Sequence, residues 1–170
     1  MVEILDALSR CVAVMPAAEA RRQLLPHRTV AILLQDADER FYLRRRTLGR
    51  FGGTKHWDVS ARGQVWAGES VRDAASRVLE EGLGIRAERL RLATVLSPVQ
   101  EHGNELLHVC LGTRPSGSGA AGALEDIEEG TFFSADEVHY LIREFRELVA
   151  PRFMLLVEAT DLLKRPGRRS

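Results

Sequence analysis

The sequence contains few cysteines and no long apolar run, and these absences exclude several classes of protein. Two cysteines, Cys11 and Cys110, are too few for the disulfide framework of small secreted domains. Each stands among apolar residues, so we expect two buried free thiols. No apolar run approaches the roughly 18 residues of a membrane-spanning helix. Membrane proteins and disulfide scaffolds are therefore not expected.

The chain also lacks an excess of charge of either sign. Its 24 basic and 24 acidic residues give a net charge of +0, so nothing draws the whole chain to nucleic acid or membrane. Glu3 and the absence of a long apolar core near the start predict no signal peptide, and hence a cytoplasmic protein. The length of 170 residues fits a single domain, and residues 164–170 form a basic end that we expect to fray.

Apolar runs separated by turn residues predict a mixed α/β chain. Strands are expected at residues 2–5, 11–14, 29–34, 41–46, 57–60, 90–99, 105–113 and 130–133. Helices are expected at residues 17–25, 135–148 and 151–163 and between Ser70, which opens the box helix, and Gly84, which ends it; loops are expected at 47–55 and 115–123. Strands on both sides of a central helix, followed by terminal helices, predict an α/β/α sandwich with a mixed sheet.

Residues 63–85 carry the most informative pattern in the chain. A glycine-containing turn leads into an amphipathic helix with carboxylates near its end. Ser70 and Asp73 have the spacing of a capping box, and Gly84 is typical of a helix C-cap. Such a turn and helix can hold a divalent cation against a diphosphate.

This segment resembles the box of the Nudix (MutT-like) hydrolase superfamily, G-x5-E-x7-R-E-U-x-E-E-x-G-U, where U is a bulky aliphatic residue. The matching residues are Gly63, Glu69, Arg77, Leu79, Glu81, Gly84 and Ile85. In the box, glutamates at i, i+3 and i+4 share one helix face and bind the magnesium or manganese that activates water. The corresponding residues here are Val78, Glu81 and Gly82, so the box is degenerate and two carboxylates are absent.

Segments outside the box resemble the isopentenyl-diphosphate-isomerase-like branch of this superfamily, over roughly residues 1–85. They comprise residues 15–20, 24–30, 41–46 and 57–60. The isomerases themselves carry a catalytic cysteine near the position of Trp57 and several metal-binding histidines. This chain has Val59, Ser60 and Ala61 there, and only His27 has a plausible histidine counterpart, so isomerase activity is not expected.

The resemblance implies roles for five residues of the box. Glu81 and Arg77 are the catalytic candidates, and Glu81 with the backbone carbonyl of Gly63 would bind Mg²⁺ or Mn²⁺. Gly63, Glu69 and Gly84 are expected to maintain the structure of the box. A solvated helix carboxylate is the alternative for Glu81, and a structural ion pair is the alternative for Glu69 and Arg77.

Two arginines are candidates for binding substrate phosphates. Arg45 lies in a run of three arginines on a predicted strand, so it points away from the face shared by its two neighbours. Arg62 stands where this branch of the superfamily carries a glycine, and a guanidinium there can bind phosphate directly. Solvated edge charges are the alternative for the arginine run. Replacement metal ligands would come from Glu101, Glu105 or Asp126.

Two functions remain open from the residues and the resemblance. The first is a metal-dependent hydrolase of a nucleoside-diphosphate-linked or other organic pyrophosphate, weakened by the missing carboxylates. The second is a catalytically inactive Nudix domain that acts as a ligand-binding or regulatory module. Both imply a small phosphorylated ligand and no nucleic acid or membrane partner, and the resemblance also suggests a homodimer.

Overall fold

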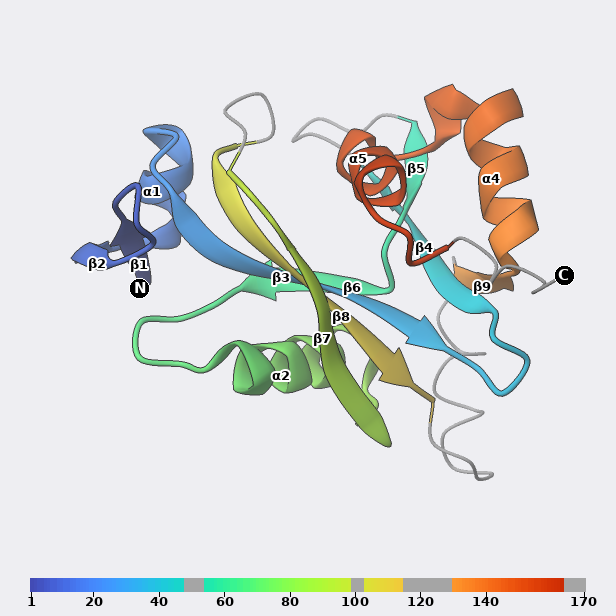
Figure 1. The fold of residues 1–170 in the computed structure, drawn as a ribbon, viewed down its shortest axis with the longest axis horizontal. Coiled ribbons are helices and arrows are strands. Elements are labelled where there is room, and N and C mark those ends of the chain that lie inside the picture. Colours follow the sequence, from blue (N-terminus) through green and yellow to red (C-terminus); the bar gives the residue numbers. More distant parts are fainter. Residues whose placement is uncertain (48–53, 99–102, 115–129, 164–170) are drawn as a thin grey trace, which may run out of the picture.

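The computed structural model describes residues 1–47, 54–98, 103–114 and 130–163 (Figure 1). Its strands form one nine-stranded mixed sheet built around β3 (His27–Gln35). The strand that pairs with β3 in parallel is β8 (Glu105–Thr113), and the antiparallel partners are β1 (Val2–Leu5), β4 (Phe41–Thr47) and β6 (Ala61–Gln64). The outer strands are β2 (Cys11–Met15) on β1, β5 (Lys55–Asp58) and β9 (Gly130–Phe133) on β4, and β7 (Arg89–Leu96) on β8.

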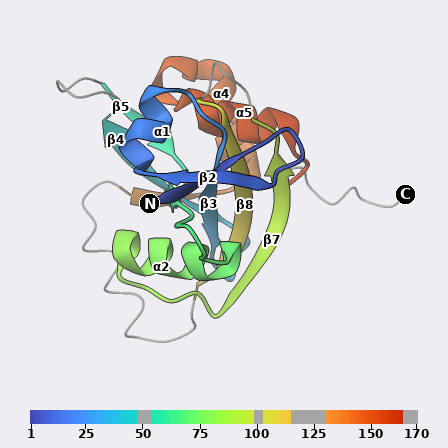
Figure 2. The same cartoon turned by 90° about the vertical axis from the view of Figure 1, so that its left-hand side faces the viewer.

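Helices cover both faces of this sheet. On one face lies α2 (Val71–Leu83), and on the other lie α4 (Ala135–Glu144) and α5 (Pro151–Ala159), as Figure 1 shows. The short helix α1 (Ala17–Arg22) lies beside β1 and β2, which is clearest in Figure 2. The predicted α/β/α sandwich with a mixed sheet is confirmed. None of the described helices is long and apolar enough to cross a membrane.

Strand β3 is central because its residues are apolar on both faces. Val30, Ile32 and Leu34 belong to the core beneath α2. Ala31 and Leu33 belong to the core beneath α4 and α5. All five are fully buried, as expected for a strand between two helical layers.

The ends of α2 follow the local signals in the sequence. The Ser70 hydroxyl accepts a hydrogen bond from the Asp73 amide at 3.1 Å and so satisfies one free donor of the first turn. Gly84 adopts φ +67° and donates its amide to Glu80 O at 2.8 Å, which closes the helix. The predicted start and end of this helix are confirmed.

The segment leading into α2 contains a strand that the sequence did not reveal. Residues Ala61–Gln64 form β6, where we expected only a turn, and Gly63 pairs with Val30 of β3. Arginine, glycine and glutamine are weak strand formers, so this strand depends on its tertiary pairing with β3. The strand predicted at residues 57–60 is instead β5, which begins at Lys55 and already ends at Asp58.

Two further expectations need correction. Cys11 is exposed, because β2 is the edge strand of the sheet and both of its faces are open; Cys110 is buried, as expected. The helices near the end are shorter than expected: α4 ends at Glu144, because the next residue, Phe145, has a φ of −135° that is not helical, and a short 3₁₀ helix (Arg146–Leu148) follows. Helix α5 ends at Ala159. The predicted loop at residues 115–123 lies outside the described residues.

Candidate functional site

The box helix packs most closely against β6 at Gly63. A Cβ atom added to Gly63 would lie 2.5 Å from Val78 Cγ2, closer than real Cβ contacts allow. Val78 is 4% exposed and belongs to the core beneath α2. Position 63 therefore requires glycine, and the residue at the first consensus carboxylate position is a core valine.

Arg77 connects the helix to the turn and to β6. Its guanidinium donates to both carboxylate oxygens of Glu69, at 2.8 and 2.9 Å, and to Gln64 O at 2.8 Å. A further bond of 3.1 Å reaches Glu81, one helical turn along. Glu69 also accepts from the Trp66 amide at 3.0 Å. This network fixes the turn before α2 to the middle of the helix.

The pKa shifts of the ion pair agree with this geometry. Hydrogen bonding from Arg77 lowers the pKa of Glu69 below its usual value, and burial opposes the shift. Hydrogen bonding to Glu69 raises the pKa of Arg77. Both residues remain charged near neutral pH, in side chains that are only 24% and 16% exposed for Arg77 and Glu69 respectively. The geometry is that of a structural ion pair.

Glu81 is the one carboxylate at a consensus metal position. Its side chain is 64% exposed, and it pairs with Arg77. The adjacent Glu80 points elsewhere, because it forms an ion pair of 3.0 Å with Arg86, beyond the helix end. As expected from the helical period, Glu80 does not replace a missing box carboxylate.

The described side chains do not fit the metal site that the box implies. Position 78 is apolar and position 82 has no side chain, and Arg44 Nη1 donates to Gly82 O at 2.9 Å. A Cβ atom on Gly82 would lie 4.0 Å from that same nitrogen. Within the described ranges, no three His, Cys, Asp or Glu side chains are grouped so as to hold a metal ion.

Of the three replacement ligands considered from the sequence, only Glu105 lies in the described part of the chain, and it is engaged elsewhere. Glu101 and Asp126 lie outside the described residues. Glu105 is described, but it accepts from the Thr29 hydroxyl at 3.3 Å and forms an ion pair with Arg152. His27 is fully buried, and its Nδ1 lies 2.7 Å from Leu25 O.

A cavity of about 340 Å³ lies beside β6 and brings together two of the predicted site residues, Arg62 and Gly63. Its lining comprises Arg21, Thr29, Val30, Arg62, Gly63, Gln64, Glu105, Leu107 and Arg152. Three arginines and one glutamate give this lining an excess of positive charge, which favours an anion. Gln64 Oε1 is buried and accepts no hydrogen bond from the described residues.

The arginines of β4 divide between the two faces of the sheet. Arg45 is exposed, and its guanidinium lies 5.5 Å from the centre of the Trp57 ring, on the side of α4 and α5. The structure therefore does not bring Arg45 to the box. Arg44 and Arg46 lie on the other side, where they donate to Gly82 O and to Ser60 O at 3.2 Å. For Arg44 and Arg46, the sequence indicated only that they share one face of the strand, opposite to Arg45.

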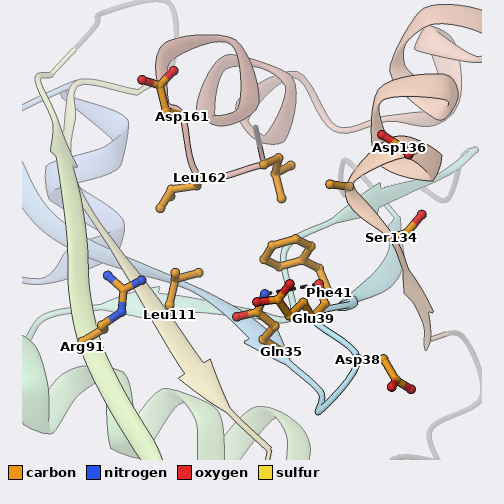
Figure 3. Close-up of a pocket in the computed structure, with 12 residues that line it drawn as sticks. Gln35, Asp38, Glu39, Phe41, Arg91, Leu111, Ser134, Asp136, Asp161 and Leu162 are labelled. Carbon is orange, nitrogen blue, oxygen red and sulfur yellow. Dashed lines mark hydrogen bonds between the residues drawn. The ribbon is translucent and has the colours of Figure 1, made fainter. Parts of the chain in front are cut away.

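A larger hollow, of about 470 Å³, lies away from the box (Figure 3). It is formed around Phe41, which belongs to the core beneath α4 and α5. Carboxylates from Asp38, Glu39 and Asp136 line it, and Arg91 lies at its other side. No residue of the box lines this hollow, so it is separate from the candidate site.

Comparisons with known proteins agree with the family resemblance and with the fold. The family model described as the NUDIX domain matches residues 25–153. An uncharacterized Nudix hydrolase of Pseudomonas aeruginosa is 38% identical over 91 residues, which are 54% of either chain. An uncharacterized Nudix hydrolase of Streptomyces coelicolor is 34% identical over 84 residues, 49% of this chain and 46% of the other. The chain thus spans about half the length of the curated relatives it matches.

The fold has counterparts among solved structures. The crystal structure of a Deinococcus radiodurans protein superimposes with a TM-score of 0.71 over 93% of this chain and 97% of that chain, at 19% identity. At this identity the similarity concerns the fold alone. The family match, over residues 25–153, covers well over half of the chain. The chain therefore belongs to the Nudix family.

Proposed function

We propose that this Nudix domain binds a small organic pyrophosphate, such as a nucleoside diphosphate derivative, and hydrolyses it only weakly. Nudix enzymes act on small phosphorylated substrates, and the cavity beside β6 has the charge for one. The observation that supports the proposal most directly is the lining of that cavity, in which Arg21, Arg62 and Arg152 face a single carboxylate, Glu105. Guanidinium groups bind phosphate oxygens strongly, often with two parallel hydrogen bonds.

Weak hydrolysis follows from the residues at the consensus metal positions. A metal ion in such a site neutralises the phosphates and activates water. Val78 is buried and apolar, and Gly82 has no side chain, so only Glu81 offers a carboxylate there. The loss of one group that stabilises charge in a transition state typically lowers kcat by about a hundredfold or more. Two missing ligands should leave little turnover.

Binding and turnover are tested separately on one panel of compounds. The panel contains nucleoside di- and triphosphates, dinucleotide polyphosphates, nucleotide sugars and coenzyme A. Calorimetry measures affinity, and phosphate release measures turnover with magnesium and with manganese. We expect at least one compound to bind and turnover to be slow. Failure of every compound to bind, with and without metal, would refute the proposed function.

Metal-dependent hydrolysis is the second candidate, and one observation favours it. Glu81 keeps the consensus position, and its carboxylate is 64% exposed, so it is open to a cation. The carbonyl of Gly63 would be the second ligand. In this case, phosphate release depends on the metal, and Glu81→Gln abolishes it. Arg86→Gln, in an exposed ion pair near the same helix end, is the control that should leave turnover unchanged.

A further inference from the structure

Three arginines gather around one buried carboxylate next to the end of the box helix. Asp58, at the end of β5, is 1% exposed. Arg46 Nε lies 3.8 Å from Asp58 Oδ2, and Arg62 Nη1 lies 3.6 Å from the same oxygen. Both separations are longer than a hydrogen bond, so the two cations share the carboxylate without being fixed by it.

The third member of this group, Arg44, is placed by the strand. Arg44 and Arg46 are two residues apart on β4, so they share one face, with Cα atoms separated by roughly 7 Å. Arg44 pairs in register with Asp58 of β5. Its guanidinium reaches the last turn of α2 and donates to Gly82 O at 2.9 Å. The group therefore extends from the helix end to Arg62, which lines the cavity beside β6.

The cationic charge of this group is only partly neutralised by the described residues. Among the described residues, Arg44 and Arg46 donate to neutral carbonyls, those of Gly82 and Ser60 respectively. Arg46 Nε is buried and donates no hydrogen bond to any described residue. Burial lowers the pKa of Arg46, Asp58 opposes this shift, and the fields of the other two arginines add to it. Within the described residues, Arg46 and Arg62 thus share one carboxylate, and the nearby Arg44 donates to a carbonyl.

Position 82 explains why a guanidinium can occupy this place. In the family pattern position 82 is a carboxylate. It lies at the C-terminal end of the helix, and this end carries a partial negative charge. Here the residue is Gly82, and a Cβ atom on it would lie 4.0 Å from Arg44 Nη1. A guanidinium therefore lies where the family pattern directs a carboxylate towards a metal, and it would repel a divalent cation.

We propose that the guanidinium groups of Arg44, Arg46 and Arg62 form a diphosphate-binding site that operates without a divalent cation. This inference rests on the proposed function, because the same organic pyrophosphate would place its diphosphate here. The three arginines provide the positive charge that a metal ion would otherwise supply. The Nε–H of Arg46, which donates to no described residue, and the forked guanidinium groups are donors for phosphate oxygens, which accept several hydrogen bonds at once.

The test uses inorganic pyrophosphate and the full chain. Calorimetry in EDTA should show binding that weakens as salt is added, because salt screens the attraction between the arginines and the approaching anion. Arg44→Gln, Arg46→Gln and Arg62→Gln should each weaken binding about tenfold or more. Arg86→Gln is the matched control: its side chain is 83% exposed and paired with Glu80, so affinity should not change.

A second variant separates binding from a role in stability alone. Asp58→Asn removes the competing carboxylate but keeps the oxygen that accepts from the Val59 amide at 2.8 Å. It should tighten pyrophosphate binding several-fold, and a purely structural role for Asp58 predicts no tightening. Binding that requires magnesium, or that is equal in wild type and the three arginine variants, would overturn the proposed site. Weaker or unchanged binding by Asp58→Asn would count against it as well.

These results also distinguish the site from the proposed function. An organic pyrophosphate that binds only with magnesium would preserve the proposed function and overturn the arginine site. Pyrophosphate binding in EDTA, with no organic compound of the panel bound, would support the arginine site and refute the proposed function. Absence of both would refute both.

Discussion

Restoring each of the two missing box carboxylates should change the free energy of unfolding by very different amounts. Val78 is 4% exposed and packs against Gly63, so Val78→Glu would bury an ionisable group. Gly82 meets only ordinary contacts, with a would-be Cβ 3.6 Å from Ala61 Cβ and 4.0 Å from Arg44 Nη1. Gly82→Glu would therefore place its carboxylate at an open position beside a cation.

The expected magnitudes follow from burial. Val78→Glu loses roughly 1.5 kcal/mol of apolar burial. If burial raises the pKa of the new carboxyl by about two units, that costs roughly 3 kcal/mol more at pH 7. Gly82→Glu should gain about 0.5 kcal/mol in helix propensity and a little from a weak ion pair with Arg44. A carboxylate near the C-terminal end of a helix is slightly unfavourable, so the net change in stability should be near zero. The two variants should differ by about 4 kcal/mol.

Urea denaturation at pH 5 and pH 8 measures the free energy of unfolding of each variant. The folded pKa of Glu at position 78 would lie above its unfolded pKa, so the variant loses stability as pH rises through that range. Val78→Glu should therefore be less stable at pH 8 than at pH 5. Val78→Thr is the control, since it keeps the shape of valine without an ionisable group. A Val78→Glu variant within about 1 kcal/mol of wild type at pH 8 would refute the reasoning.

Three further outcomes follow from the structure. Arg77→Gln should cost about 2 kcal/mol of unfolding free energy in urea, because Glu69 loses a partly buried partner. Because the pKa of Glu69 is lowered in the folded state, the stabilisation from this ion pair is lost as pH falls through the folded pKa. The loss of unfolding free energy in Arg77→Gln should therefore be smaller in acid, and an equal loss at pH 3 would contradict this. Ser134→Ala removes the capping box of α4 and should lower stability by about 1 kcal/mol, whereas an unchanged denaturation midpoint would exclude a stabilising cap. Iodoacetamide at pH 8 should label exposed Cys11 quickly and Cys110 only on unfolding, because burial raises the pKa of Cys110 to about 11; equal rates by mass spectrometry would show that the β8 core opens.

The sequence predicted the parts of this fold that depend on neighbours along the chain. The ends of α2 were readable because Ser70 and Gly84 act on the backbone within a few residues of themselves. Strand β8 was predicted with its observed bounds, because residues 105–113 form an apolar run between turn residues. The family resemblance located the box in the same way, by fixed local spacing.

The remaining features depend on contacts between distant residues. Arg44 and Gly82 are 38 positions apart, and no local pattern relates them. Cys11 looked like a core residue because its neighbours are apolar, but its strand became a sheet edge. Arg62 was identified as a candidate phosphate ligand, yet its shared carboxylate, Asp58, was not, because the turn between β5 and β6 brings them together.

The positive charge of Arg44 at the end of α2 leads to a prediction about magnesium binding. A divalent cation at the Gly82 carbonyl would approach Arg44, whose Nη1 lies 2.9 Å from that oxygen. At roughly 4 Å and an effective dielectric constant near 20, the repulsion between charges of +2 and +1 is about 8 kcal/mol. One exposed carboxylate, Glu81, which is already paired with Arg77, does not offset this.

Millimolar magnesium should therefore leave the melting temperature unchanged, whereas pyrophosphate in EDTA should raise it, since a ligand that binds only the folded state stabilises it. Differential scanning fluorimetry with calcium as a second hard cation provides the comparison. A rise of several degrees with magnesium alone, lost in Glu81→Gln, would show that the helix end still attracts a cation despite Arg44. The charge argument would then be wrong, and the box would have to be regarded as a working metal site.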